Sequence, residues 1–265
     1  MRNDYTYLAH WVWSSADSRT KHRGSSSADF EQIFLEDEPY MRQLSYNNQP
    51  LPPEQEKRQI AVMEAFARAH REAKSRPAGL PAFYTALELP ITQLLDEFNL
   101  HVKGKQLLDG REVYVIKALP KDTIPKDGLA KDGQGPADAR QEQARHFKLK
   151  LWIEPAEAQI VKVEGEVLRD IVVTDIPTIA GPIENETPVV VESQRMRFLV
   201  KPGTVIRMEW TRLDDGAWLP KHAYSKMERI WLEFPHAHSS SRWREVRDCT
   251  YSNYKKFRVK TTIVP

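Results

Sequence analysis

Histidine and cysteine are the side chains of this sequence best suited to hold a metal ion or to act as a nucleophile. His236 and His238 stand two residues apart in a Pro-His-Ala-His-Ser segment, and His222 or Asp248 would have to supply a third ligand. That spacing matches neither a helical zinc motif nor a cysteine ribbon. We therefore expect two solvated loop histidines, with no metal and no cofactor bound.

Other motifs that carry chemistry are weak or missing. Asp214-Asp215-Gly216 resembles the start of a calcium loop, but Ala217, Trp218 and Leu219 follow where ligands are needed, so a turn is predicted. The sequence has no serine-nucleophile motif and no glycine-rich phosphate loop. Cys249 lies in a predicted strand without an adjacent histidine and is expected to be inert. The alternative left open is a hydrolase or a metal-dependent enzyme that uses histidines such as His146, His222, His236 and His238.

Charge and composition exclude several classes of protein. The 265 residues carry 39 basic and 37 acidic side chains, a net charge of +2, which offers no global attraction for nucleic acid. One cysteine excludes an internal disulfide framework. No run approaches the ~20 apolar residues of a membrane span. The segments 241–247 and 254–258 mix aromatic and basic residues, but Glu245 and Asp248 interrupt them, and they are interpreted as a cationic outer sheet face.

The elements that must position these residues follow from hydrophobic periodicity. Period-two patterns predict strands over 5–13, 28–36 and 40–46, with a polar connection over 14–27. A helix is predicted over Glu54–Lys74 and a shorter one after Pro90, through Ile91, Leu94, Leu95 and Phe98. About seven further strands follow, beginning near Leu100, with a tight hairpin at Asp109-Gly110. This order predicts a single α+β domain over 1–265, with mobile insertions at 120–143 and 174–194.

Four short motifs resemble one bacterial family. Asp109-Gly110-Arg111 followed by Val113–Ile116, Leu151–Glu154 followed by Gln159–Glu164, Asp215–Pro220, and Tyr251–Phe257 are similar, in order and spacing, to segments of outer-membrane lipoprotein-sorting proteins. The matches span roughly residues 100 to 260. The first hundred residues and the two insertions depart from the family, and no arginine is recognisable in the position that the true carriers use.

The resemblance implies a LolA/LolB-like half-barrel, in which helices cover the concave face of a strongly curved antiparallel sheet. It also implies a non-enzymatic binding protein of the periplasm or cell envelope, monomeric, with a lipid, acyl chain or lipidated protein as partner. Peripheral contact with the membrane or envelope proteins fits this role. No signal peptide is visible, so one is expected to have been removed.

A ligand-binding cleft is expected between the helices and the sheet, lined by apolar side chains chosen from helical stripes and strand parity. Methionine and tryptophan suit a surface that accepts an irregular apolar guest. The same side chains could instead fill a solid core, as in a purely structural envelope protein. The predicted lining consists of Ile60, Met63, Phe66, Leu94, Phe98, Tyr114, Ile116, Phe147, Leu149, Leu151, Met208, Trp210 and Met227.

Overall fold

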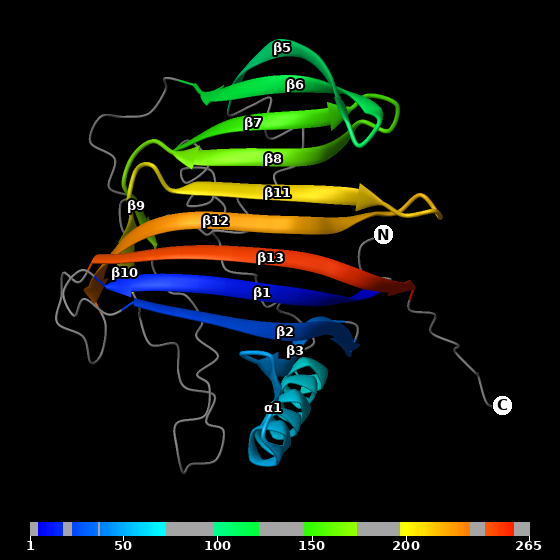
Figure 1. Ribbon diagram of the computed structural model, residues 1–265, viewed down its shortest axis with the longest axis vertical. Coiled ribbons are helices and arrows are strands. Elements are labelled where there is room, and N and C mark those ends of the chain that lie inside the picture. Colours follow the sequence, from blue (N-terminus) through cyan, green and yellow to red (C-terminus); the bar gives the residue numbers. More distant parts are fainter. Residues whose placement is uncertain are drawn as a thin grey trace.

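An open antiparallel sheet dominates the computed structural model of the chain (Figure 1). The structure describes residues 5–17, 23–36, 38–72, 98–121, 146–173, 197–233 and 242–256. The expected insertions at 120–143 and 174–194 lie outside these ranges, apart from Pro120 and Lys121. The predicted second helix lies outside them too, except for its last residue, and so do His236 and His238.

The described residues form 13 strands of one sheet, and the first and last of these strands lie side by side in its interior. The path is β4-β3-β2-β1-β13-β12-β11-β8-β7-β6-β5, while β10 pairs with both β12 and β9. The strands are β1 (Tyr5–Asp17), β2 (Arg23–Leu35), β3 (Glu38–Tyr46), β4 (Gln49–Pro50), β5 (Phe98–Leu108), β6 (Arg111–Pro120), β7 (Phe147–Glu154), β8 (Gln159–Val167), β9 (Ile171–Val173), β10 (Arg197–Val200), β11 (Val205–Arg212), β12 (Trp218–Glu233) and β13 (Arg242–Lys256).

Tight turns set the register of the hairpins. Asp109 and Gly110 have φ values of 49° and 77°, as a type I′ turn requires, and they join β5 to β6. Asn47 and Asn48 also have positive φ values, 49° and 61°, between β3 and β4. Asparagine tolerates this conformation because its short side chain bonds locally. The turns predicted at both places are confirmed.

The helix α1 (Pro53–Glu72) begins at Pro53, close to its expected start. Proline at the first helical position loses no hydrogen bond, and Glu54 and Glu56 face the positive end of the helix dipole. The helix lies beside the β2–β3 end of the sheet: the rings of Phe66 and Tyr40 are 5.1 Å apart, and Arg71 pairs with Glu36 at 3.2 Å (Figure 1). Helical cover over the apolar side of the sheet stays a prediction.

Two local predictions were wrong. The stretch 14–27 is largely strand rather than loop, because β1 runs on to Asp17 and β2 begins at Arg23, and the two strands pair throughout. Phe98 is not helical but opens β5, where it lies opposite Pro120. Strand pairing and burial of its ring, which is 2% exposed, outweigh the local helical spacing.

Candidate functional site

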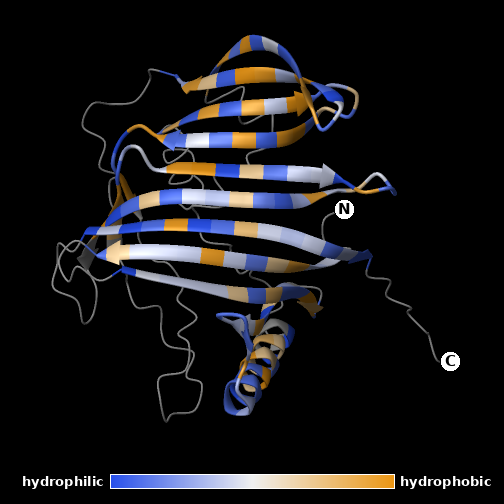
Figure 2. Ribbon diagram, viewed as in Figure 1, coloured by the Kyte–Doolittle hydropathy of each residue, from blue (hydrophilic) through white to orange (hydrophobic). Residues whose placement is uncertain are grey.

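Hydrophobic and hydrophilic residues alternate along several strands (Figure 2), and this alternation gives the sheet two chemically different sides. On one side Ile116, Leu151, Val163 and Met208 stand in register across β6, β7, β8 and β11. We call this side the apolar face. On the other side the next row contains Lys117, Lys150, Glu164 and Arg207, and we call it the charged face. Because successive side chains point to opposite sides, each strand contributes to both.

The apolar face carries the main hydrophobic cluster of the molecule. It draws side chains from β5 to β12, including the short β9–β10 hairpin. Large aliphatic and aromatic side chains buried this way contribute roughly 1.5–3 kcal/mol each to folding. The buried members are Phe98, Ala118, Phe147, Leu149, Leu151, Val163, Val167, Ile171, Phe198, Val200, Ile206, Trp210 and Met227.

Most of the predicted lining from the strands lies in this cluster. Five residues predicted on strands are buried members, with 2–8% of their surface exposed: Phe147, Leu149, Leu151, Trp210 and Met227. Ile116 and Met208 are partly buried and pack against them. Tyr114 is half-buried at the margin, opposite Ile153, and Lys105 lies 5.0 Å from its ring.

Of the lining predicted on helices, only Phe98 joins the cluster among the described residues, and it does so from β5, with 2% of its surface exposed. Ile60 is 51% exposed, while Met63 and Phe66 are half-buried on α1, which lies at the far end of the sheet from β5–β8. Leu94 lies outside the described residues. Alternation along the strands therefore located the buried apolar residues better than the apolar stripe of the helix did. A stripe shows that a helix has an apolar side, but it does not identify the surface against which that side packs.

A buried ionic group lies at the edge of the apolar face, and the sequence patterns did not predict it. Glu245 is 7% exposed and accepts hydrogen bonds from Arg229 and Arg247. By register Glu245 lies opposite Met227, on the apolar face. The reading of 241–247 as an outer cationic face holds for Arg242 and Arg244, which pair with Glu228, but not for Glu245.

The histidines that the structure describes do not converge on one site. His222 Nε2 lies 3.0 Å from Asp248 Oδ1 on β12 and β13, while His146 Nδ1 donates to the Asp170 carbonyl oxygen at 3.2 Å. The described residues contain no group of three or more His, Cys, Asp or Glu side chains that could hold a metal ion. The histidine-enzyme alternative therefore has no assembled site in the described part of the chain.

One trio of residues, Ser45, His10 and Asp29, has the composition of a hydrolase triad but not its hydrogen-bond arrangement. His10 Nδ1 lies 2.7 Å from Asp29, and the Ser45 hydroxyl donates to the same carboxylate. These bonds, that of Ser45 above all, lower the pKa of Asp29. The serine proton is thus directed to the carboxylate, a weak base, and not to the histidine, so His10 does not activate the hydroxyl as a nucleophile.

Cys249 is expected to be chemically inert in the folded protein. Burial raises the pKa of its thiol to about 12, so almost no thiolate exists at neutral pH. A thiol-specific reagent at pH 8 should therefore modify the native protein at least 100-fold more slowly than the protein unfolded in guanidinium. Equal rates in the two states, followed by absorbance, would contradict this burial.

The fold is that of an open antiparallel sheet with an apolar face and a charged face, and a second, smaller hydrophobic cluster of Val113, Val115, Trp152 and Val161 is buried on the charged face. No protein-family model matches the chain, and no curated protein matches it. Of the described residues, no helical stretch has the length and apolar character that a membrane span requires.

Among solved structures, the chain is similar to the group that its motifs resemble. A domain described as a putative outer membrane lipoprotein-sorting protein from Vibrio parahaemolyticus aligns with a TM-score of 0.32 and 9% identity, over 98% of this chain and 87% of that one. A DUF1329 family protein from Desulfovibrio piger gives 0.29 and 9%, over 98% and 88%. A LolA superfamily protein from Nitrosomonas europaea gives 0.25 and 10%, over 96% and 86%.

Proposed function

We propose that this protein is a non-enzymatic carrier of the cell envelope, which binds a lipid, an acyl chain or the lipid part of a lipoprotein against the apolar face. The observation that carries the proposal is the breadth of that face: one continuous apolar cluster spans β5 to β12 on a sheet that does not close. The sequence motifs similar to lipoprotein-sorting proteins support the same role. A monomer in the periplasm is part of the proposal.

The composition of the face suits an acyl guest. Met208, Trp210 and Met227 lie on neighbouring strands β11 and β12, and methionine adapts its shape to irregular apolar surfaces. Each methylene that such a face removes from water contributes about 0.8 kcal/mol, so micromolar binding, about 8 kcal/mol, needs roughly ten buried methylenes. A single long acyl chain supplies that number.

Bulk added to the apolar face should weaken binding of a fluorescent fatty acid. Met208→Trp is chosen because Met208 is only partly buried, so the larger ring is expected to occupy guest space rather than unfold the core. Displacing two or three methylenes corresponds to about 2 kcal/mol, or roughly 30-fold weaker binding. Fluorescence titration at fixed temperature, with competition by a lipid extract, measures the change.

The matched control is Lys226→Trp. Lys226 is exposed on the charged face of β12, opposite Val205 of β11, so the same new side chain lies on the other side of the sheet. Binding should then stay within twofold of the unmodified protein. A folded wild-type protein that binds no fatty acid at micromolar concentration, and from which no lipid can be extracted, would instead make the apolar cluster a filled structural core.

A further inference from the structure

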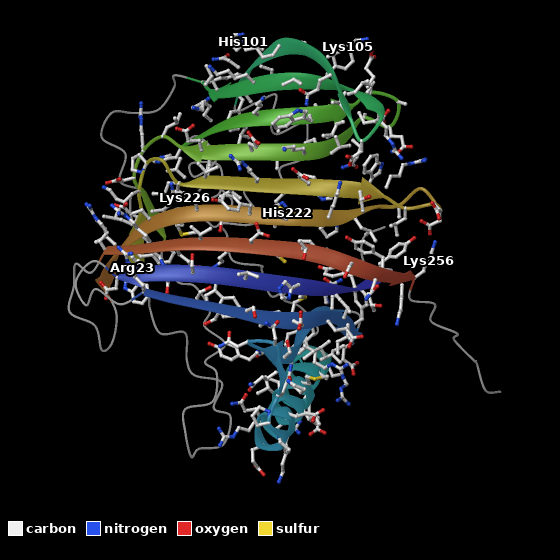
Figure 3. All side chains as sticks on the ribbon, viewed as in Figure 1. Arg23, His101, Lys105, His222, Lys226 and Lys256 are labelled. Atoms are coloured by element: carbon white, nitrogen blue, oxygen red, sulfur yellow. The ribbon has the colours of Figure 1, made fainter. Side chains whose placement is uncertain are left out.

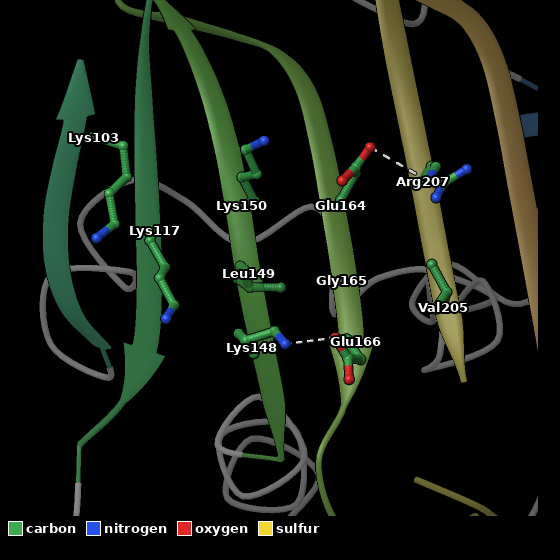
Figure 4. A pocket seen from close by; sticks show the side chains of 10 residues that line it. All are labelled: Lys103, Lys117, Lys148, Leu149, Lys150, Glu164, Gly165, Glu166, Val205 and Arg207. Carbon is green, nitrogen blue, oxygen red and sulfur yellow. Dashed lines mark ion pairs between the residues drawn. The ribbon is translucent and has the colours of Figure 1, made fainter. Parts of the chain in front are cut away.

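A hollow of about 360 Å³ lies on the charged face, over β5 to β11 (Figure 4). This volume falls at the lower end of the range of small-molecule sites, about 300–1,000 Å³. Two carboxylates, Glu164 and Glu166, line the hollow. The cationic side chains that line it are Lys103, Lys117, Lys148, Lys150 and Arg207. The hollow therefore carries a clear excess of positive charge, although the whole chain is nearly neutral.

Both carboxylates of the hollow already have cationic partners. Glu166 pairs with Lys148 at 2.5 Å, and Glu164 pairs with Arg207 at 3.4 Å. Among the residues that the structure describes, no carboxylate lies within ion-pair distance of the three other cations, which are Lys103, Lys117 and Lys150. Three ammonium groups are thus left to bind an external anion.

Two of these three lysines repel each other when no ligand is bound. Lys117 of β6 and Lys150 of β7 lie directly opposite each other, where like charges destabilise a sheet. The Nζ of Lys150 lies 4.5 Å from the centre of the Trp152 ring, a contact that attracts a cation but leaves its charge in place. An anion bound between the two lysines would remove their repulsion.

The third lysine extends the positive charge to a third strand. Lys103 stands at a bulge in β5, since Val102 pairs with Ile116 and Gly104 pairs with Val115. Neighbouring strands lie about 4.8 Å apart, so the lysines of β5, β6 and β7 span roughly 10 Å across the sheet. Two anionic groups joined in one small molecule fit this span better than a single anionic group does.

The chemistry of lysine indicates phosphate as the anionic group. An ammonium group has hydrogen-bond donors and no acceptor, so it matches oxygens that only accept, and lysine binds phosphate as a compact point charge. The exposed apolar side chains of β5, Val102 and Leu107, lie opposite Ile116 and Glu112 and point to the other side of the sheet. They therefore add no apolar surface to the hollow, and the observations favour a ligand that is free in solution.

We propose that the Lys103–Lys117–Lys150 hollow binds a small, water-soluble compound with two phosphate groups. One phosphate group lies between Lys117 and Lys150, where it neutralises their repulsion, and the other lies towards Lys103. This site is separate from the apolar face, so acyl binding can fail while phosphate binding succeeds, and the reverse.

Calorimetric titration with pyrophosphate tests the proposal. The wild-type protein should bind pyrophosphate at least about fivefold more tightly than orthophosphate, because only pyrophosphate can contact all three lysines. An exposed ion pair is worth up to about fivefold in a binding constant, so Lys117→Gln/Lys150→Gln should bind pyrophosphate roughly 25-fold more weakly, and Lys103→Gln roughly fivefold more weakly. Without ligand, the double variant should melt at the same or a higher temperature than wild type, because a repulsion has been removed. Loss of folding then cannot explain its loss of binding.

The matched control is Lys57→Gln/Arg58→Gln. Both side chains are exposed on α1, which lies at the opposite end of the sheet from β5 (Figure 3). Salt screens charges that are farther apart than the Debye length of about 8–10 Å, so the control should bind pyrophosphate within about twofold of wild type. Equal weakening in the two double variants would reduce the effect to net charge and overturn the site.

Three further outcomes would also overturn the proposal. Absence of pyrophosphate binding by the folded wild-type protein would remove the site. Binding of orthophosphate, or of citrate with its charge on carboxylates, as tight as that of pyrophosphate would contradict a site for two phosphate groups. Binding to vesicles that contain phosphatidylglycerol, without binding of pyrophosphate, would contradict a ligand that is free in solution.

Discussion

Replacing Glu245 with alanine is expected to lower the free energy of unfolding by about 3–5 kcal/mol. Glu245 is 7% exposed and is the shared carboxylate of Arg229 and Arg247. Arg229, whose side chain is 17% exposed, would keep its charge next to the apolar face after the exchange. Removing one member of a buried ion pair costs more than the pair itself contributed, because the remaining charges lose that carboxylate in a poorly hydrated place. Denaturation by urea, followed by tryptophan fluorescence, measures the difference.

The matched control is Glu112→Ala. Glu112 pairs with Lys105 at 2.7 Å, but both side chains are about half exposed, at 55% and 48%. Solvent screens this pair, and its loss should cost less than about 1 kcal/mol. Similar decreases in the free energy of unfolding for the two variants would show that the buried ion pairs of Glu245 stabilise the fold no more than the exposed pair of Glu112 does.

Truncation of Leu151 is the second substitution expected to have a large effect. Leu151 is 2% exposed, stands between Ile116 and Val163 in the central row of the apolar face, and contacts the main cluster. Leu151→Ala should reduce the free energy of unfolding by about 2–5 kcal/mol, with the spread set by how far the neighbours close the cavity. The same denaturation experiment gives the value.

Leu107→Ala provides the comparison with identical chemistry. Leu107 is 76% exposed on β5, so its removal leaves no cavity and should change stability by less than about 0.5 kcal/mol. If Leu151→Ala were equally mild, the side chains of the apolar face would not be closely packed around it. Such a result would favour a face that is open to a guest along that row.

Local sequence patterns predicted the buried residues correctly where a strand has one buried side. Phe147, Leu149 and Leu151 alternate with Lys148 and Lys150, and all three apolar side chains are buried as predicted. The hairpin at Asp109-Gly110 was equally readable, because few residue types accept two successive positive φ angles. Each of the two patterns spans only a few neighbouring residues of the chain.

Local sequence patterns did not predict the structure where pairing between distant segments of the chain determines it. The serines of 14–27 have low strand propensity, yet Ser14 pairs with both Ser25 and Val246 in the middle of the sheet. Glu245 looked like an outward-facing acid among arginines, and only its register with Met227 places it on the apolar face. The hollow on the charged face likewise joins residues of five strands that no local motif connects.

The position of β13 has a consequence for how the chain folds. β13 lies between β1 and β12 and is thereby the only strand on the sheet path that links the block β1–β4 to the block β5–β12, within the part of the chain that the structure describes. Tyr5 near the start of the chain lies opposite Lys256 near its end. Contacts between such distant segments slow folding, because a long loop must close before they form. During synthesis, β1 can pair with β2 but has to wait for β13 before its other edge is paired, so the sheet path from β4 to β5 becomes continuous only when residues 242–256 have been made.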